Sequence, residues 1–356
     1  MAKVLMRGNH VVAESAVRAG CRFYFGYPIT PQNEIPEYMS ERLSKIEGGA
    51  FVQAESEVAS IHMVIGASMA GGRVMTSSSG PGISLKQEGL SFLAALELPA
   101  IVVNMSRGGP GLGNIAPAQS DYFQATRGGG HGDYRNIVLA PNSGQELADL
   151  TYEAFNLADK YRSPVVILGD GMLGQMMEPV ELPPEIKISD LPPKDWVLTG
   201  AKGRPSRLIR SLLLDPNEEE ERNWKLMRKY EKIKNEEVKW EASSADDAKV
   251  IVVAFGIAAR IAKGAIKRLR QQGLKVGLIR PISLWPFPYQ AIRDYTKKVR
   301  RFFVFEMNMG QMLEDVRLAI EGNGDVHFYG RPGGVILTPL EISRAISSYY
   351  YKKKLG

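Results

Sequence analysis

Cysteine is nearly absent from the chain, because its 356 residues include a single one, Cys21. One cysteine cannot form an internal disulfide, and this chain alone cannot hold a cysteine-ligated iron–sulfur cluster or a zinc ribbon. The surrounding sequence, RAGCRFYFGYP, predicts a buried thiol where a helix gives way to a strand. A catalytic thiol is the less favoured interpretation, since a cysteine nucleophile needs a neighbouring base and none is evident.

Long apolar runs are also missing, and no stretch reaches the roughly eighteen residues that a membrane span requires. The N-terminal segment MAKVLMRGNHVVAESAVRAG enters an amphipathic pattern directly. It lacks the apolar core and the cleavage site of a signal peptide. We therefore expect a cytoplasmic protein that does not associate with a membrane.

A strong excess of one charge is absent as well, because 45 Lys and Arg face 39 Asp and Glu, for a net charge of +6. The basic residues are dispersed, and the densest groups are the C-terminal YKKKLG and a helix in which they alternate with acids. A nucleic-acid-binding protein is disfavoured, since no clustered basic face or base-stacking motif is seen. We expect a solvated surface, with weak docking of an acidic protein as the secondary interpretation.

What the first 180 residues do contain is a regular alternation of short apolar runs and helix-length segments. Nearly continuous apolar strands alternating with helices predict a parallel sheet covered on both faces, and hence an α/β fold. We expect a first domain over residues 1–185. Its predicted strands are 22–28, 49–55, 72–78, 99–106, 136–142 and 164–170.

The middle of the chain, residues 186–245, is expected to connect two domains. Prolines in ELPPE and DLPPKDW indicate an extended linker over 181–205. A charged helix is predicted over 215–241, with Asp215 as its cap and a proline in the first turn. Four residues spaced by three are predicted to form its apolar stripe: Trp224, Met227, Tyr230 and Ile233.

The last part of the chain, 246–356, is predicted to be a second α/β domain. A helix over 257–273 ends at Gly273, a residue typical of helix C-termini. The expected strands are 248–256, 274–281, 300–310 and 325–330.

Two loops that follow predicted strands are rich in Gly, Ser and Pro, namely 76–89 (TSSSGPGISLKQEG) and 105–134. Ligands of α/β proteins bind at such loops, and backbone amides at a helix N-terminus attract anions. The first loop lacks the Lys-[Ser/Thr] ending of a nucleotide-hydrolase P-loop, and GGPGLG fails as a dinucleotide fingerprint. The alternative is that the glycines only allow tight packing, although a loop of about thirty residues is usually functional or disordered.

Acidic residues follow two of the predicted strands, and each could have either a structural or a functional role. The Gly-Asp-Gly at 169–171 is not followed by an asparagine until Asn217, so a metal site is unsupported, and Asp170 is predicted to be a strand-end or helix-capping residue. Glu55 and Glu57 lie where a strand gives way to an apolar helix. A glutamate there either caps the helix or is partly desolvated and suited to proton transfer.

Several motifs together resemble a known family. Glu57 with Gly66 nine residues later, then RVMTSSSGPG and LELPAIVVN, resemble the pyrimidine-binding domain of thiamine diphosphate enzymes such as acetolactate synthases. The segments YPITP, SRGGPG, IRPISLWPFP and EMNMGQ are similar to the alpha chains of 2-oxoacid:ferredoxin oxidoreductases. The resemblance covers essentially the whole chain and is strongest for 2-oxoisovalerate- and 2-oxoglutarate-type enzymes.

The resemblance implies a pyrimidine-binding domain followed by a domain like the transketolase C-terminal domain. It implies oxidative decarboxylation of a 2-oxoacid to an acyl-coenzyme A and CO2, with electrons passed to ferredoxin in anaerobic metabolism, and it leaves the physiological direction of the reaction open. Thiamine diphosphate is then shared with a beta subunit that holds Mg2+, and [4Fe-4S] clusters lie in partner subunits. An α2β2 assembly is expected, with a gamma subunit and a small ferredoxin-like chain as optional additions.

The resemblance also implies roles for individual residues. Glu57 would hydrogen-bond a ring nitrogen of the cofactor's aminopyrimidine and drive its tautomerisation, with Glu55 as the runner-up. Arg107 would face the substrate carboxylate, and Thr30, held between two prolines, would donate or accept a hydrogen bond at the substrate. The expected cofactor-binding residues, besides Glu57, are Tyr27, Pro28, Ile29, Ser79 and Gly80, and no metal ligand is expected.

The implied substrate depends on a departure from the family pattern. Many 2-oxoglutarate enzymes carry a Ser-Thr pair after RGGP, where this chain has Gly111 and Leu112. A leucine there favours a branched or apolar substrate, whereas Arg127, His131 or Arg135 could meet a second carboxylate. The rival activity is a non-oxidative thiamine diphosphate decarboxylase or carboligase, disfavoured because those enzymes usually carry both halves of the cofactor site on one chain.

Overall fold

The computed structural model describes residues 3–352 of the chain. Its strands are β1 (Val4–Arg7), β2 (Phe23–Gly26), β3 (Ala50–Gln53), β4 (Val74–Ser78), β5 (Ala100–Ser106), β6 (Ile137–Leu139), β7 (Pro164–Asp170), β8 (Met177–Val180), β9 (Trp240–Ser243), β10 (Val250–Val253), β11 (Val276–Pro281), β12 (Ser283–Trp285), β13 (Arg301–Glu306) and β14 (Asp325–Gly330). Its helices are α1 (Gly8–Arg18), α2 (Glu34–Leu43), α3 (Glu57–Met69), α4 (Pro81–Leu85), α5 (Gln87–Ala95), α6 (Tyr122–Arg127), α7 (Gly144–Tyr161), α8 (Gly171–Gln175), η1 (Ile188–Asp190), α9 (Pro216–Glu236), α10 (Gly256–Gln271), α11 (Tyr289–Thr296), α12 (Gln311–Ile320) and α13 (Pro339–Lys352).

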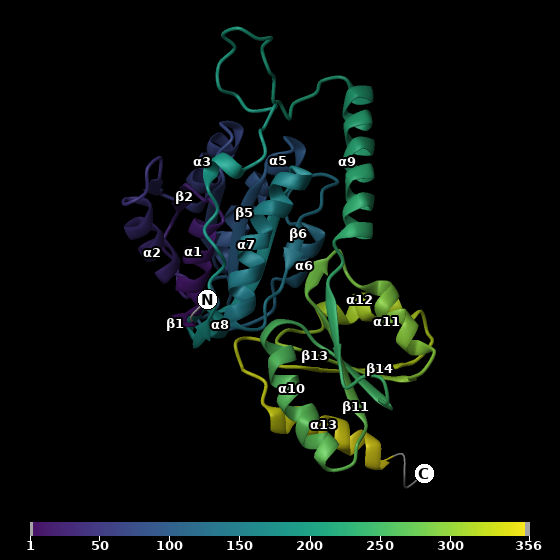
Figure 1. Cartoon of the computed structure of the whole chain (residues 1–356). Helices are drawn as coiled ribbons and strands as arrows, with labels where there is room; N and C mark the ends of the chain where they lie inside the picture. The colour runs from purple at the N-terminus through teal and green to yellow at the C-terminus, as the bar shows by residue number, and fades with distance from the viewer. Residues whose placement is uncertain (1–2, 353–356) are drawn as a thin grey trace.

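Two α/β units lie side by side, each built on its own sheet (Figure 1). The first sheet has the order β12-β6-β7-β5-β4-β2-β3, and its six strands from the first unit all run parallel. The second sheet has the order β14-β13-β10-β11-β9, with only β9 antiparallel. The predicted α/β fold with two mainly parallel sheets is confirmed. A small antiparallel pair, β1 with β8, was not predicted.

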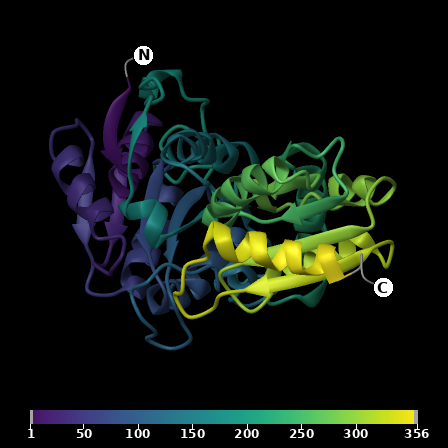
Figure 2. The same ribbon diagram turned by 90° about the horizontal axis from the view of Figure 1, so that it is seen from below.

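The first sheet is covered on both faces, as its sequence pattern indicates. Strands β4, β5 and β7 are buried along their whole length, which an exposed sheet face would not allow. Helix α1 packs against α2 and α7, while α3 packs against α5. Seen from below in Figure 2, the second unit stands beside this layered body, with α13 near the end of the chain on its outer part.

The connecting segment agrees with the sequence in outline and differs in its helix. Residues 181–215 contain only the short η1, and α9 then runs beside the first unit and leads into the second (Figure 1). Asp215 caps α9 by accepting a hydrogen bond from Asn217 N, as predicted. The helix ends at Glu236, earlier than expected, because β9 follows and joins the second sheet.

The predicted apolar stripe of α9 is wrong in part. Tyr230 and Ile233 are buried, but Trp224 is 58% exposed and Met227 is 43% exposed. A spacing of three residues falls about 60° short of a full turn at each step, so the stripe drifts away from the buried face. Leu226, four residues before Tyr230, takes the place on that face.

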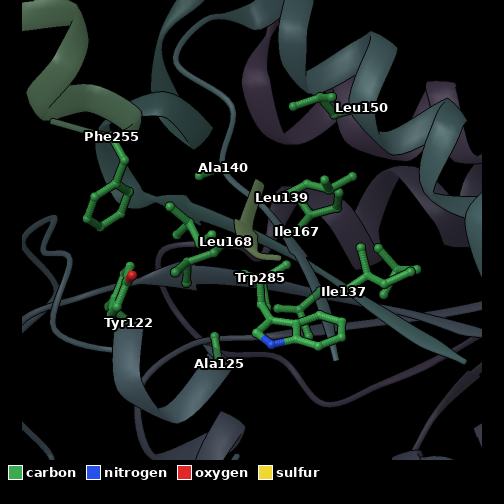
Figure 3. Close-up of a cluster of buried hydrophobic side chains, with 14 of the residues drawn as sticks. Tyr122, Ala125, Ile137, Leu139, Ala140, Leu150, Ile167, Leu168, Phe255 and Trp285 are labelled. Atoms are coloured by element: carbon green, nitrogen blue, oxygen red, sulfur yellow. The ribbon is translucent and has the colours of Figure 1, made fainter. Parts of the chain in front are cut away.

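One strand of the second part of the chain belongs to the first sheet. β12, from the segment IRPISLWPFP, pairs antiparallel with β6 at the edge of the seven-stranded sheet. Its Trp285 lies among buried side chains of the first unit, such as Ile137, and Phe255 of the second unit packs near Tyr122 in the same cluster (Figure 3). The apolar core therefore continues from one unit into the other.

Ion pairs of the fully buried Arg280 with two partly exposed glutamates reinforce this junction. Arg280 of β11 donates to both carboxylate oxygens of Glu146 in α7, at 2.8 and 2.6 Å. Its Nε also lies 3.0 Å from Glu241 Oε1 in β9. A guanidinium with no exposed surface is tolerated only when carboxylates offset the lost hydration, so these three elements are held in one arrangement.

Candidate active site

The predicted site residues come together at one edge of the first sheet. The strands β2, β4, β5 and β7 are parallel, so their carboxyl ends and the loops that follow lie at the same edge. Tyr27 to Thr30 follow β2, Ser79 and Gly80 follow β4, and Arg107 follows β5. Glu57 opens α3, the helix that follows the neighbouring strand β3.

Arg107 joins two of these loops. Its Nη1 donates to Thr30 O at 2.8 Å and its Nη2 donates to Leu112 O at 3.0 Å. The side chain is buried, and its Nε–H has no hydrogen-bond partner within the described residues. Arg107 therefore tethers the loops and still has N–H groups left for an anion.

Thr30 does not cap a helix, and its neighbour Pro31 does not lie in a helical first turn. α2 begins only at Glu34, and its N-cap position is taken by Asn33, whose side chain instead donates to Thr30 Oγ1 at 3.4 Å. Pro31 is buried and precedes the helix by three residues. Thr30 and the preceding Tyr27 and Pro28 are exposed at the edge, while Ile29 is half-buried, so this turn presents its groups outward.

The loop after β4 leaves room for Arg107 and Glu57 through its two glycines. Gly80 has a φ of +50°, and a Cβ there would lie 2.8 Å from Arg107 Nε. A Cβ at Gly82 would collide with Ser78 Oγ and Glu57 Oε1. Ser79 is buried and donates to Met105 O at 2.7 Å, which ties this loop to β5.

The two candidate glutamates lie in different environments. Glu55 is exposed, whereas Glu57 is 6% exposed and its Oε1 lies 3.4 Å from the Ser78 hydroxyl. Neither caps α3, because Ser56 takes that place and accepts from Ala59 N. The carboxyl group of Glu57 is thus held within the site for a purpose other than capping.

The sequence interpretation missed a buried lysine, Lys86, whose side-chain nitrogen contacts the backbone oxygen of Glu57. Lys86 is fully buried between α4 and α5, and its Nζ bonds Ser60 Oγ, Thr76 Oγ1 and the backbone oxygen of Glu57. Burial lowers the pKa of Lys86 to about 7, against the opposing effect of the Glu57 charge. Only its position in GISLKQEG, four residues after Gly82, could have drawn attention to it.

The long loop after β5 is held by the second unit through Gln119. Its Nε2 donates to Phe255 O at 2.9 Å, and its Oε1 accepts from Met307 N at 3.0 Å. Its backbone N–H donates to Met307 O at 3.0 Å, and Asn308 Nδ2 donates to its backbone oxygen at 2.9 Å. These four bonds, called the Gln119 clamp below, fix the loop that begins at Arg107.

The EMNMGQ segment forms the other side of the clamp. Glu306 is fully buried and accepts from Met312 N and Leu313 N at the start of α12, and from Asn308 Nδ2. Burial raises the pKa of Glu306 to about 7. The carboxyl group therefore serves to position Asn308, which in turn holds the backbone of Gln119.

Several other predictions concern single residues. Asp170 caps α8, as predicted, by accepting from Met172 N and Leu173 N, and burial raises its pKa to about 6.

Within residues 3–352, no group of three or more His, Cys, Asp and Glu is arranged to hold a metal. Cys21 is buried, as predicted, and burial raises the pKa of its thiol to about 12. No helix of this range is long and apolar enough to cross a membrane.

The three basic residues considered for a second carboxylate have other partners. Arg127 forms ion pairs with Glu314 and Asp315 of α12, and Arg135 donates to Tyr134 O. The backbone oxygen of His131 accepts from Ser91. None of the three forms a hydrogen bond with Arg107, Thr30 or Leu112 in the structure of residues 3–352.

The site edge is open on this chain. Two cavities of about 990 and 780 Å3, one beside α9 and one beside α11, contain none of the predicted catalytic or cofactor-binding residues, although Arg127 and Arg135 line the second. Apolar side chains around the edge are exposed instead: Tyr27 by 39%, Leu112 by 77%, and Val58 and Met63 on α3 by 38% each. A ligand bound here would be covered by this chain on one side only.

Comparison with protein families gives two matches that cover most of the chain. Residues 14–244 match the thiamine-diphosphate-binding domain of pyruvate flavodoxin/ferredoxin oxidoreductases. Residues 248–342 match core domain II of pyruvate:ferredoxin oxidoreductase.

Curated relatives are similar over nearly their whole length. Ketoisovalerate oxidoreductase subunit VorB of Methanothermobacter marburgensis is 51% identical over 346 residues, 97% of this chain and 97% of that protein. The 2-oxoglutarate synthase subunit KorA of Methanocaldococcus jannaschii is 38% identical over 96% of this chain and 98% of that protein.

Two solved structures resemble the fold. A 2-oxoglutarate:ferredoxin oxidoreductase from Magnetococcus marinus, with 2-oxoglutarate, coenzyme A and succinyl-CoA bound, aligns with a TM-score of 0.85 and 30% identity. The alignment covers 98% of this chain but only 65% of that longer chain. A split-gene transketolase in an inactive beta4 tetramer aligns with a TM-score of 0.59 at 13% identity, which shows a likeness of fold.

We expect substitution of Gln119 by Ala to loosen the loop after β5. The change removes two side-chain bonds and leaves Phe255 O and Met307 N without these partners, a loss of about 1–3 kcal/mol. Backbone amides of residues 108–116 should exchange hydrogen for deuterium faster by mass spectrometry. Gln290→Ala, at an exposed pair with Asp294, is the control. Unchanged exchange in the Gln119 variant would contradict the clamp.

Proposed function

Since the chain belongs to the pyruvate flavodoxin/ferredoxin oxidoreductase family, we propose that it is the alpha subunit of a 2-oxoacid:ferredoxin oxidoreductase. The reaction is the oxidative decarboxylation of a 2-oxoacid with coenzyme A to an acyl-coenzyme A and CO2, with two electrons passed to ferredoxin. The observation that carries the assignment to this site is the gathering of Glu57, Thr30 and Arg107 at one sheet edge. Coenzyme A and ferredoxin are cytoplasmic reactants, so a cytoplasmic location is part of the proposal.

The donor set at the edge fits thiamine diphosphate. When bound, this cofactor supplies the carbon nucleophile that attacks the 2-oxo group and stores the electrons released on decarboxylation. A buried carboxyl group suits hydrogen bonding to a ring nitrogen, and Glu57 offers one beside Gly82, where a larger residue would collide with it. Ser79 and Gly80, on the loop after β4, are also proposed to contact the cofactor. The same role is proposed for Tyr27, Pro28 and Ile29, on the turn after β2.

Glu57 is proposed to hold and move the proton at the cofactor ring. Its burial supports this role over Glu55, because a carboxyl group in contact with water would exchange its proton freely. The hydroxyl of Ser78 at 3.4 Å directs one oxygen of Glu57, and the other oxygen is left for the ring. In this proposal Glu55 has no contact with the cofactor.

Arg107 and Thr30 are proposed to bind the substrate. Arg107 has an unpartnered, buried Nε–H and one unused N–H on each Nη, so it can bind a carboxylate while it tethers both loops. The exposed hydroxyl of Thr30 lies on the turn whose backbone oxygen contacts Arg107. The 2-oxoacid would thus meet a cation on the loop after β5 and a hydroxyl group on the turn after β2.

A partner subunit is part of the proposal. The relatives are named as subunits, and the single cysteine cannot ligate an iron–sulfur cluster. The exposed apolar residues of α3 and of the 108–115 loop support docking of a beta subunit that holds Mg2+ and the diphosphate. Such an assembly, proposed as α2β2, would cover the open edge and exclude water from it.

A branched-chain 2-oxoacid is the proposed substrate. Leu112, five residues after Arg107, accepts a hydrogen bond from Arg107 through its backbone oxygen, and its apolar side chain is 77% exposed at the edge. The candidate cations for a second carboxylate form their contacts elsewhere. The 51% identity to a ketoisovalerate enzyme against 38% to a 2-oxoglutarate enzyme supports the same choice.

We expect Glu57→Gln to reduce acyl-coenzyme A formation by about 100-fold or more, since general acid–base groups contribute that much. The measurement is reduction of an electron acceptor by the alpha chain reconstituted with its beta chain, thiamine diphosphate, Mg2+ and coenzyme A. Glu55→Gln, a matched change two residues away at an exposed position, should retain activity. An inactive Glu55 variant beside an active Glu57 variant would refute the assignment.

We further expect kcat/KM of the reconstituted complex to be higher for 2-oxoisovalerate than for 2-oxoglutarate. Substitution of Leu112 by Ser should lower kcat/KM for 2-oxoisovalerate by about tenfold, because an apolar contact worth about 1–3 kcal/mol is lost. Leu318→Ser, an exposed leucine on α12, is the matched control. A preference for 2-oxoglutarate in the unaltered complex would contradict the substrate proposal and leave the family assignment intact.

A further inference from the structure

Lys86 is a fully buried basic side chain for which the site described above has no use. It lies between α4 and α5, and its Nζ reaches α3 and β4 rather than solvent. Its three neighbours are Ser60 Oγ, Thr76 Oγ1 at 3.0 Å and Glu57 O at 3.5 Å. All three are oxygen atoms, as many as an ammonium group has hydrogens to donate.

Two of these hydrogen bonds have a fixed direction, with Lys86 as the donor. The hydroxyl of Ser60 already donates its hydrogen to Glu57 O at 2.9 Å, so it must accept from Lys86. Glu57 O also accepts from Lys86, because a carbonyl oxygen has no hydrogen to give. At least two of the three contacts therefore use N–H groups of Lys86 as donors.

The charge of Lys86 has one counter-charge nearby. The side chain of Glu57 opposes the effect of burial on the lysine, and it comes from the same first turn of α3 that holds the lysine's nitrogen. Within residues 3–352, the other side chains that form hydrogen bonds with Nζ offer hydroxyl groups, Ser60 from α3 and Thr76 from β4. Glu88, in the first turn of α5, is exposed.

Stability does not explain a lysine in this place. Removing an ammonium group from water costs free energy, and uncharged hydroxyl and carbonyl partners repay only part of it. An unbranched apolar side chain of similar length would fill the same space without that cost. The presence of a basic group at this buried position therefore calls for a functional explanation.

We propose that Lys86 is a positioning residue that keeps Glu57 in its carboxylate form and so biases the shared proton toward the ring of the cofactor. The inference rests on the proposed function, in which Glu57 bonds a ring nitrogen. When the proton moves, the O–H bond of Glu57 breaks and an N–H bond forms on the ring. Lys86 keeps its own protons and balances the carboxylate that results.

The same lysine also fixes where that carboxylate lies. Its bonds to Ser60 and to Glu57 O hold the first turn of α3 against β4, and the carboxyl group of Glu57 projects from that turn. Charge and position are separable by mutation. Ser60→Ala removes one bond to the lysine and keeps the ammonium, whereas Lys86→Met keeps the volume and removes the charge.

The first test is the pH dependence of kcat in the reconstituted complex. In Lys86→Met, the acid limb should move up by about one pH unit and kcat should fall about tenfold near neutral pH, because no neighbouring cation then balances the negative charge of the Glu57 carboxylate. KM for the 2-oxoacid should not change. Ser60→Ala should keep the acid limb of the unaltered complex, whatever its kcat.

The second test needs no activity. The pKa of Lys86 is lowered in the folded chain, so the unfolded chain binds more protons above about pH 7 and stability rises with pH until the unfolded lysine titrates. Removal of the lysine should therefore stabilise the chain in urea unfolding most at pH 6, with a gain that shrinks by pH 9. Lys225→Met, at an exposed ion pair with Glu97, is the control and should show no such pH-dependent gain.

The outcomes separate this inference from the function on which it rests. An unaltered complex without thiamine-dependent activity would refute the proposed function. If the unaltered complex is active but the acid limb of the pH profile does not move in Lys86→Met, the proposed role of Lys86 is refuted and the proposed function stands. Lys86→Gln gives a second variant if the methionine variant does not fold, and a loss of stability at pH 6 in both would refute a charged lysine in the folded chain.

Discussion

The parallel pairing of β2, β4, β5 and β7 is the constraint on which the rest of the molecule depends. The carboxyl ends of parallel strands lie at the same edge of the sheet, so the geometry of the sheet alone brings together loops that are far apart in sequence. Arg107 after β5 can then reach the backbone of Thr30 after β2, and Glu57 can lie against the loop after β4. A shift in the register of these strands would separate all three groups at once.

Contacts from the second unit fix the loop that follows β5. The loop after β5 is too long to be fixed by its strand alone, and the Gln119 clamp ties it to Phe255 and Met307 of the second unit. β12 and the buried Arg280 ion pairs hold that unit in place. The site on this chain remains open on one side, which agrees with an enzyme whose cofactor lies between two chains.

The sequence predicted most of the sheet because its apolar runs are short, strongly β-branched and bounded by glycine and proline. Local patterns also identified the caps at Asp170 and Asp215. The apolar stripe of α9 was misjudged, because a spacing of three fits two residues on one face and then drifts away from it. β12, the Gln119 clamp and the burial of Lys86 depend on contacts between distant parts of the chain, which no local pattern records.

The structure of the assembled complex with thiamine diphosphate, by cryo-electron microscopy or crystallography, tests the central claim most directly. We predict that the Glu57 carboxyl group lies within hydrogen-bond distance of a nitrogen of the aminopyrimidine ring. The ring should lie against the loop after β4, with the diphosphate and Mg2+ held by the partner subunit. A ring bonded by Glu55 instead, or a diphosphate held by residues 169–171 of this chain, would contradict the account.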